Sequence, residues 1–296
     1  MEFAADFTDT DRAALRAAVE RLERPGLAGR LVALTGKPIA YFERALPEGA
    51  AAVIARAAGL ALDRALDAAL VTIENPRLAH LARGRRTHTA LACAVGAVGG
   101  AFGMAALAVE LPVSTTIMLR AIAAIAREEG EDLADPGTAL ACLEVFALGA
   151  PSPGLPGEGR LGESGYFAIR AMLVRALAGM ADSVVDRGVL REGAPYLARF
   201  LARVAGRFGL VVSQKLMAQA AVVLGAIGGA AVNLAFAEHF QELARGHFTV
   251  RRLERVYGAD PVRAEYERLR AALVAEGASR LPPPGRRFIS WRRETS

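Results

Sequence analysis

The stretch from His88 to Ala126 reads H-T-A-L-A-C-A-V-G-A-V-G-G-A-F-G-M-A-A-L-A-V-E-L-P-V-S-T-T-I-M-L-R-A-I-A-A-I-A. No charged residue occurs from Thr89 to Val109, which is about the length of a membrane-spanning helix. Glu110 and Pro112 then interrupt the apolar sequence, and a second apolar helix is expected to follow. The chain is therefore expected to be organised around long apolar helices.

A second apolar stretch runs from Gly209 to Ala237 and repeats the pattern G-A-V-G-G-A of 96–101 as G-A-I-G-G-A at 225–230. Small residues every three or four positions share one helix face and let another helix approach closely. We therefore expect two glycine-rich apolar helical hairpins. The helix-packing positions would be Gly96, Gly99, Gly100, Gly103, Gly225, Gly228 and Gly229.

The remaining sequence predicts an all-α helical bundle, because no segment alternates with a period of two. Helices are expected from a cap at Asp9 or Thr10 to about Pro25, from Glu48 to Glu74, from Tyr166 to about Val185 and from Pro195 to Phe208. In the 48–74 helix, Val53, Ile54, Ala57, Leu60 and Ala61 are expected to line the buried face.

Each apolar stretch leads into a long helix, then a glycine, an Asp-Pro pair and another helix. The glycines are Gly130 and Gly258, and the pairs are Asp135-Pro136 and Asp260-Pro261. This order suggests a weak internal repeat. Chance similarity within Ala- and Gly-rich sequence is the alternative.

The chain is expected to form a single helical domain over residues 1–279. Residues 150–165 are rich in Pro and Gly and predict a mobile loop or lid. Residues 280–296 carry five arginines, three consecutive prolines, Phe288 and Trp291. We expect a disordered basic tail, with an arm for an anionic membrane surface or nucleic acid as the alternative. For the chain as a whole we expect no nucleic-acid partner.

Composition points to a cytoplasmic protein. Hydrophobic residues make up 53% of the 296 residues, and the net charge is +5 with only Lys37 and Lys215 as lysines. Abundant Ala, Arg and Gly are typical of a GC-rich bacterial genome. Cys93 and Cys142 lack metal or redox spacing and lie in apolar sequence, as expected in a reducing compartment. The acidic start of the sequence does not resemble a secretion signal.

Glu110 is the most informative single residue, because it is a charge at a break in apolar sequence. A carboxylate beside a new helix start is favoured by the helix dipole. Arg120 lies about 15 Å away along a helix and cannot pair with Glu110 within one straight helix. A partner from the second apolar stretch is the alternative.

The segment after Asn233 carries two histidines and several charges. His239 and His247 are about 12 Å apart along a helix, so one metal ion cannot join them, and we expect no metal and no cofactor. The charges fit a salt-bridged surface or, alternatively, a buried polar cluster. The candidate binding cluster comprises Glu110, Arg120, Asn233, His239, Glu242, Arg245, His247 and Arg252.

Catalytic motifs are absent from the sequence: there is no GxSxG frame, no phosphate-binding loop and no HExxH. An enzyme is therefore not the favoured class. A hydrolase, with or without a metal, would need Glu110, His239, Glu242 and His247 to converge from the two halves.

The patterns G-A-V-G-G-A-F-G…E-L-P…R-A-I-A-A-I-A-R-E-E-G-E-D-L-A-D-P and A-V-N-L-A-F-A-E-H-F-Q-E-L-A-R-G-H-F-T-V-R-R-L-E-R-V-Y-G resemble the EcsC protein family over about Ala50 to Gly258. The matching positions are Glu110, Pro112, Arg120, Gly130, Asp135, Asn233, His239, Arg245, His247, Phe248, Arg252 and Glu254. Glu110 stands where the family usually has Asp. The resemblance implies no defined reaction, and it suggests an accessory role beside an ABC transport system.

The sequence favours an accessory protein of the cytoplasmic face that associates with the inner face of the cell membrane or binds a lipid-like ligand. ABC transporter components are the expected protein partners through the resemblance. A hydrolase and a purely structural adaptor remain the alternatives.

Overall fold

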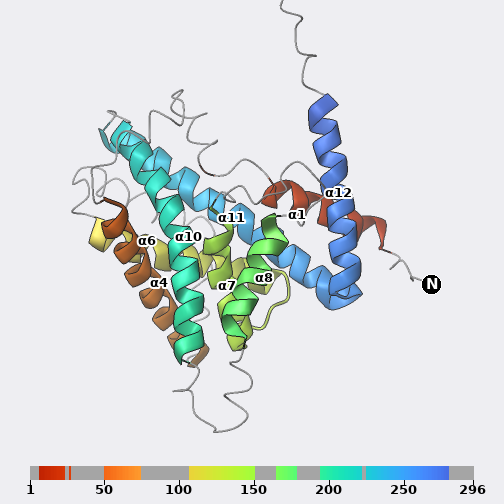
Figure 1. The fold of residues 1–296 in the computed structure, drawn as a ribbon, viewed down its shortest axis with the longest axis horizontal. Helices are drawn as coiled ribbons and strands as arrows, with labels where there is room; N and C mark the ends of the chain where they lie inside the picture. Colours follow the sequence, from red (N-terminus) through yellow and green to blue (C-terminus); the bar gives the residue numbers. More distant parts are fainter. Residues whose placement is uncertain are drawn as a thin grey trace, which may run out of the picture.

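A computed structural model describes residues 7–23, 27, 50–74, 107–150, 165–178, 194–221 and 225–279. These residues form eight α-helices and no strand, which confirms the all-α prediction (Figure 1). The helices are α1 (Asp9–Leu22), α4 (Ala50–Glu74), α6 (Leu107–Glu128), α7 (Pro136–Leu148), α8 (Gly165–Leu177), α10 (Ala194–Ala221), α11 (Gly225–Tyr257) and α12 (Ala259–Ser279).

Helix ends follow local capping chemistry. Asp135 caps α7 by accepting a hydrogen bond from the Gly137 N–H, and Pro136 occupies the first turn, as predicted. The cap of α1 was predicted one or two residues too late. Thr8 is the cap, because its hydroxyl accepts the Asp11 N–H at 3.1 Å.

Two glycines with positive φ mark corresponding points in the chain. Gly130 (φ 80°) follows α6, and Gly258 (φ 88°) follows α11. An Asp-Pro pair then opens the next helix in each case, at 135–136 and at 260–261. The described geometry thus has the helix–glycine–helix order on which the repeat hypothesis depends.

Two predicted helix breaks are wrong. α6 begins at Leu107 and continues through Pro112, which lies in its second turn and removes one backbone hydrogen bond without ending the helix. α10 likewise runs unbroken through Gly209. A Cβ at Gly209 would lie 4.0 Å from the Ala55 Cα, so this glycine serves close packing of α10 on α4.

The buried face of α4 agrees only in part with the predicted one. Ile54, Ala57 and Ala61 are buried as predicted, whereas Val53 and Leu60 are 50% and 51% exposed. The prediction was wrong for these two residues, because helix neighbours α6 and α10 cover only one side of α4.

α7 lies at the centre of the molecule, between α10 and the C-terminal part of α11 (Figure 1). Its residues from 138 to 148 are buried on almost every side except Leu140, as expected for a helix that is apolar all round. Phe146 of α7 contacts Phe208 of α10 and Phe240 of α11, with ring centroids 5.0 and 5.2 Å apart. This aromatic cluster joins the central helix to its neighbours.

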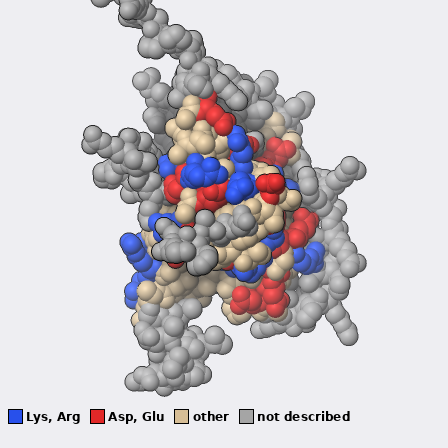
Figure 2. Space-filling view, turned by 90° about the vertical axis from the view of Figure 1, so that its right-hand side faces the viewer, with Lys and Arg blue, Asp and Glu red and all other residues tan. Residues whose placement is uncertain are grey.

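Ion pairs are distributed unevenly over the described structure. We call α4, α10 and the N-terminal parts of α6 (107–118) and α11 (225–237) the apolar half. Ion pairs gather on α1, α12 and the C-terminal part of α11 (238–257), the ion-paired half. Figure 2 looks at the side where α12 lies and shows acidic and basic side chains next to one another.

Several predictions fall outside the described residues. These are the helix-packing role of Gly96, Gly99, Gly100 and Gly103, the loop over 151–164 and the tail over 280–296. Gly225, Gly228 and Gly229 belong to the start of α11, but their surroundings are likewise outside the description. No helix within the described ranges combines the length and apolar character needed to cross a membrane.

Candidate functional site

A buried ion pair joins the two apolar stretches. The Lys215 Nζ of α10 donates to the Glu110 Oε1 of α6 over 2.7 Å, and the two side chains are 1% and 7% exposed. Glu110 thus has its partner in the second apolar stretch, as the alternative interpretation suggested. Burial lowers the pKa of Lys215, and the charge of Glu110 opposes that shift.

Aromatic and polar groups surround this pair. The Phe236 ring of α11 lies with its centroid 5.0 Å from Lys215 Nζ, a cation–π contact. Asn233, one helix turn before Phe236, is also buried. The Thr115 hydroxyl is buried without a hydrogen-bond partner in the described part of the chain. The pair and its surroundings form a small polar island inside the apolar half.

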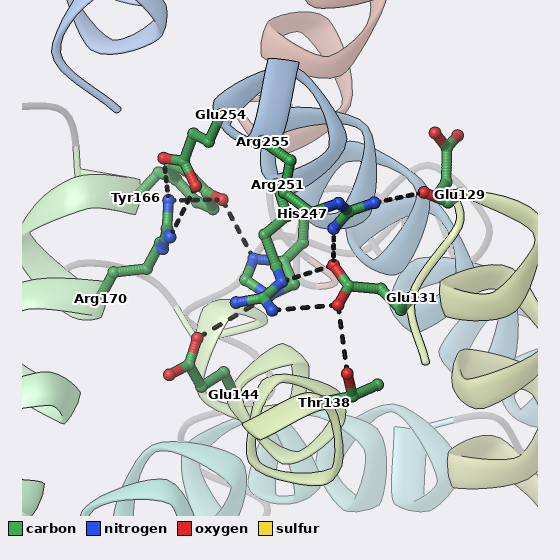
Figure 3. A network of polar contacts seen from close by, with 10 residues as sticks. All are labelled: Glu129, Glu131, Thr138, Glu144, Tyr166, Arg170, His247, Arg251, Glu254 and Arg255. Atoms are coloured by element: carbon green, nitrogen blue, oxygen red, sulfur yellow. Dashed lines mark hydrogen bonds and ion pairs between the residues drawn. The ribbon is translucent and has the colours of Figure 1, made fainter. Parts of the chain in front are cut away.

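A second polar network centres on His247 of α11 (Figure 3). The Tyr166 hydroxyl lies 3.0 Å from His247 Nδ1, and both side chains are buried. Arg170 donates two hydrogen bonds to Glu254 at 2.7 and 2.9 Å, and a longer one of 3.4 Å to Tyr166. This bidentate pair ties α8 to α11 and orients the Tyr166 hydroxyl beside the imidazole.

The other imidazole nitrogen faces a carboxyl group. His247 Nε2 lies 3.8 Å from Glu144 Oε2 of α7, too far for a hydrogen bond, and has no other partner among the described residues. Burial lowers the pKa of His247 well below its ordinary value, and Arg170 and Arg251 lower it further. Burial raises the pKa of Glu144, although the same two arginines oppose that shift. The contact is therefore between two groups whose charged forms are both disfavoured by burial.

An arginine cluster on α11 holds the turn between α6 and α7. Arg251 donates to both carboxylate oxygens of Glu131 at 2.8 and 3.1 Å, and Arg255 also pairs with Glu131 (Figure 3). Arg252 bridges Glu129 and Asp11, at 2.9 and 3.1 Å. Burial tends to raise the pKa of Glu131, but the hydrogen bond and charge of Arg251 outweigh it and leave the pKa lowered. These contacts fix α1, α11 and the turn after α6 to one another.

The structure distributes the eight predicted site residues over several places. Glu242 pairs with Arg21 of α1 and with Arg245 on its own helix. His239 Nε2 lies 3.2 Å from the Gly149 carbonyl oxygen, at the end of α7. Arg120 is exposed on α6.

The four residues of the hydrolase interpretation therefore have separate partners. His239 and His247 are eight residues apart on the continuous helix α11, which places them about 12 Å apart along its axis. No three His, Cys, Asp or Glu side chains in the described ranges are placed to hold a metal ion together.

Sequence reasoning did not single out Tyr166, Glu144 or Arg170 and gave Lys215 no partner. Two of these four residues had a signal in the sequence. Glu144 is the one charged residue in α7, and Lys215 is a rare lysine within an apolar stretch. A charged residue that must be buried needs a partner. Its presence in an apolar segment therefore predicts a polar contact with another part of the chain.

The comparisons with known proteins agree with the motif resemblance. The model of the EcsC protein family matches residues 77–253, which is more than half of the chain and narrower than the span expected from the motifs. No curated protein and no solved structure matches the chain significantly. On the strength of the family match, this chain belongs to the EcsC protein family.

Proposed function

We propose that this protein is an accessory protein of the cytoplasmic face that associates with the membrane through its apolar half. The observation that carries the proposal is the uneven distribution of ion pairs in the fold. Ion pairs gather on α1, α12 and the C-terminal part of α11, while the apolar half holds a buried pair, Lys215–Glu110.

The sequence segments without charge meet the described structure in one region. The uncharged segment Thr89–Val109 ends directly before Glu110, and its last three residues are the first residues of α6. The uncharged segment Leu216–Ala237 begins directly after Lys215. Because Glu110 and Lys215 are hydrogen bonded, the start of α6 and the end of α10 lie close together. Figure 1 shows the start of α11 at the same end of the molecule as the end of α10. Uncharged sequence that borders this end of the described structure is suited to an apolar partner such as lipid.

We further propose that the protein assists an ABC transport system. This part is supported by family resemblance, because the founding member has the context of such an accessory. The contacts around Glu110 and Lys215 neither require nor oppose it. A lipid-like ligand held by the apolar half would be compatible with the same role.

The test is fractionation of cells that express the full chain, followed by successive washes of the membranes with high salt and detergent. We expect the protein in the membrane fraction, with partial release by salt, because the chain is basic. Quantitative recovery in the soluble fraction at low salt, with no binding to added vesicles, would overturn the proposal. Association with ABC transporter subunits would be tested by crosslinking in the same membranes.

A further inference from the structure

The arginines of this protein fall into two groups with different surroundings. Most of those with carboxylate partners lie on α1, α11 and α12, as with Arg12, Arg16 and Arg268, and Arg170 on α8 pairs with Glu254. A second group is exposed and has no carboxylate within ion-pair distance among the described residues. It consists of Arg56 and Arg64 on α4, Arg120 on α6, Arg175 on α8, and Arg199 and Arg203 on α10.

Exposed aliphatic side chains accompany the second group. Leu60 on α4 is 51% exposed and Leu210 on α10 is 50% exposed. Arg56, Leu60 and Arg64 are spaced four residues apart and therefore share one side of α4. Each of the two helices thus presents arginine and leucine to solvent.

α10 carries a similar side. On α10, Arg199, Arg203 and Leu210 fall at spacings of four and seven, which again place them on one side of the helix. α4 and α10 pack directly against each other, and the close approach of Gly209 to Ala55 lies beside Leu210. We call Arg56, Leu60, Arg64, Arg199, Arg203 and Leu210 the α4–α10 face.

This face has an excess of positive charge. α10 contains no acidic residue, so its arginines cannot pair along their own helix. On α4, Asp63 is exposed beside Arg64, but no ion pair forms between the two. Four arginines together with Asp63 and Asp67, which follows Arg64 by three positions on α4, give a net charge of +2. A partner that matches it must offer negative charge and apolar surface together.

We propose that the α4–α10 face binds the headgroups of anionic lipids, with Leu60 and Leu210 entering the interface between headgroups and acyl chains. The proposal rests on the proposed membrane association and names the surface and lipid class that would carry it. Each arginine near an anionic leaflet strengthens binding about fivefold, and long arginine side chains reach headgroups while their stems stay among apolar groups. The neighbouring uncharged segments favour a membrane over an acidic protein segment as the partner.

The test is vesicle flotation with the purified full-length chain. Vesicles of phosphatidylcholine alone are compared with vesicles that also contain phosphatidylglycerol. The variants are the pair Arg199→Gln/Arg203→Gln and the pair Leu60→Gln/Leu210→Gln. The matched control is Arg16→Gln/Arg268→Gln, which removes the same charge from exposed arginines that have glutamate partners.

We expect the wild-type chain to prefer the anionic vesicles. The variant lacking Arg199 and Arg203 should bind them about 25-fold more weakly, with a shallower dependence on salt. The leucine variant should lose binding to both vesicle types, and the control should bind anionic vesicles much more tightly than the Arg199/Arg203 variant. Circular dichroism would verify that each variant is folded.

Four outcomes would overturn the inference. Equal binding of the wild-type chain to both vesicle types would show that it does not recognise anionic headgroups, although membrane association would still hold. Equal losses in the control and in the Arg199/Arg203 variant would show that net charge acts, not this face. Tighter binding to polyglutamate than to anionic vesicles would show that the partner is an acidic polypeptide. Failure to bind any vesicle would defeat the proposed function as well.

Discussion

Lys215 and Glu110 are 105 positions apart in the chain, yet they form a hydrogen-bonded ion pair of 2.7 Å that is almost fully excluded from solvent. Each charge is tolerated in the apolar half because the other is present. Removing water from two charges is costly, and their attraction offsets this only when the geometry is good. The pair also fixes the register of α10 against α6, since a slide of one turn would separate the two side chains.

The first prediction concerns this pair. Lys215→Met alone should lower the free energy of unfolding by about 3–5 kcal/mol, because a buried carboxylate is left without its partner. Glu110→Leu alone should have a similar effect, since it strands the ammonium group. The double variant Glu110→Leu/Lys215→Met should return to near the wild-type value, because apolar groups replace both charges. Urea unfolding of the four proteins gives the coupling energy.

Additive losses in that cycle would contradict the expected coupling. A suitable control is Glu238→Gln on α11, an exposed carboxylate whose loss should change the unfolding free energy by less than about 0.5 kcal/mol.

The second prediction concerns His247 and pH. In the unfolded chain its pKa is near 6.5, and burial holds the folded-state pKa well below that value. Between these two pKa values the unfolded chain binds a proton that the folded chain does not. The contribution of His247 to stability is therefore present at neutral pH and is lost as pH falls below about 6.5, by up to about 1.4 kcal/mol per pH unit.

The measurement is urea unfolding of the wild type and of His247→Gln at a series of pH values from 7.5 to about 5. Glutamine keeps a polar partner for Tyr166 but does not titrate. The variant should be less stable at neutral pH and should lose stability less steeply on acidification. Parallel curves would show that His247 does not titrate between the two states.

The third prediction has the opposite sign and concerns Glu144. Its folded-state pKa is raised above 4.5 by burial, so at intermediate pH the folded chain holds a proton that the unfolded chain releases. Stability from this group is present at low pH and is lost as pH rises through the window above 4.5. Glu144→Gln resembles the protonated form, and its stability relative to wild type should increase with pH.

Thermal unfolding at matched pH values would test this, with Glu20→Gln on the surface of α1 as the control. A difference between Glu144→Gln and wild type that does not change with pH would mean that Glu144 has the same pKa in both states.

The fourth prediction compares two glycines inside helices. A Cβ at Gly246 of α11 would lie 2.7 Å from the Leu22 Cγ of α1, so Gly246→Ala should destabilise the protein by about 1–3 kcal/mol through overpacking. A Cβ at Gly206 of α10 would meet nothing within 4 Å. Gly206→Ala should raise the free energy of unfolding by about 0.5–1 kcal/mol through helix propensity.

Chemical denaturation of both variants measures the two changes in the free energy of unfolding. Equal and favourable effects would show that α1 can move away from α11 at little cost.

Local features of the fold could be predicted from the sequence because their causes are local. Asp135 and Pro136 lie beside the helix that they start, and Gly130 can close α6 because a glycine accepts a positive φ. The breaks expected at Pro112 and Gly209 were wrong for a tertiary reason. Packing of α6 and α10 against α4 stabilises both helices through these residues.

The polar contacts were harder to predict, because they join residues distant in the chain. Tyr166 and His247 are 81 positions apart, and no periodicity relates them. The sequence left a partner for Glu110 in the second apolar stretch as an alternative, but it could not choose that partner because the pairing of the helices was unknown. The same limit applies to Glu242 and Arg21, which meet only because α1 packs on α11.

Arg207 joins two helices through hydrogen bonds to main-chain oxygens and not through an ion pair. From α10 it donates hydrogen bonds of 2.7 and 2.9 Å to the carbonyl oxygens of Ala147 and Ala150, at the end of α7. Because both acceptors are main-chain oxygens, α10 cannot slide past α7 without breaking these bonds. Arg207 thus ties α10 to the end of the central helix without an acidic partner.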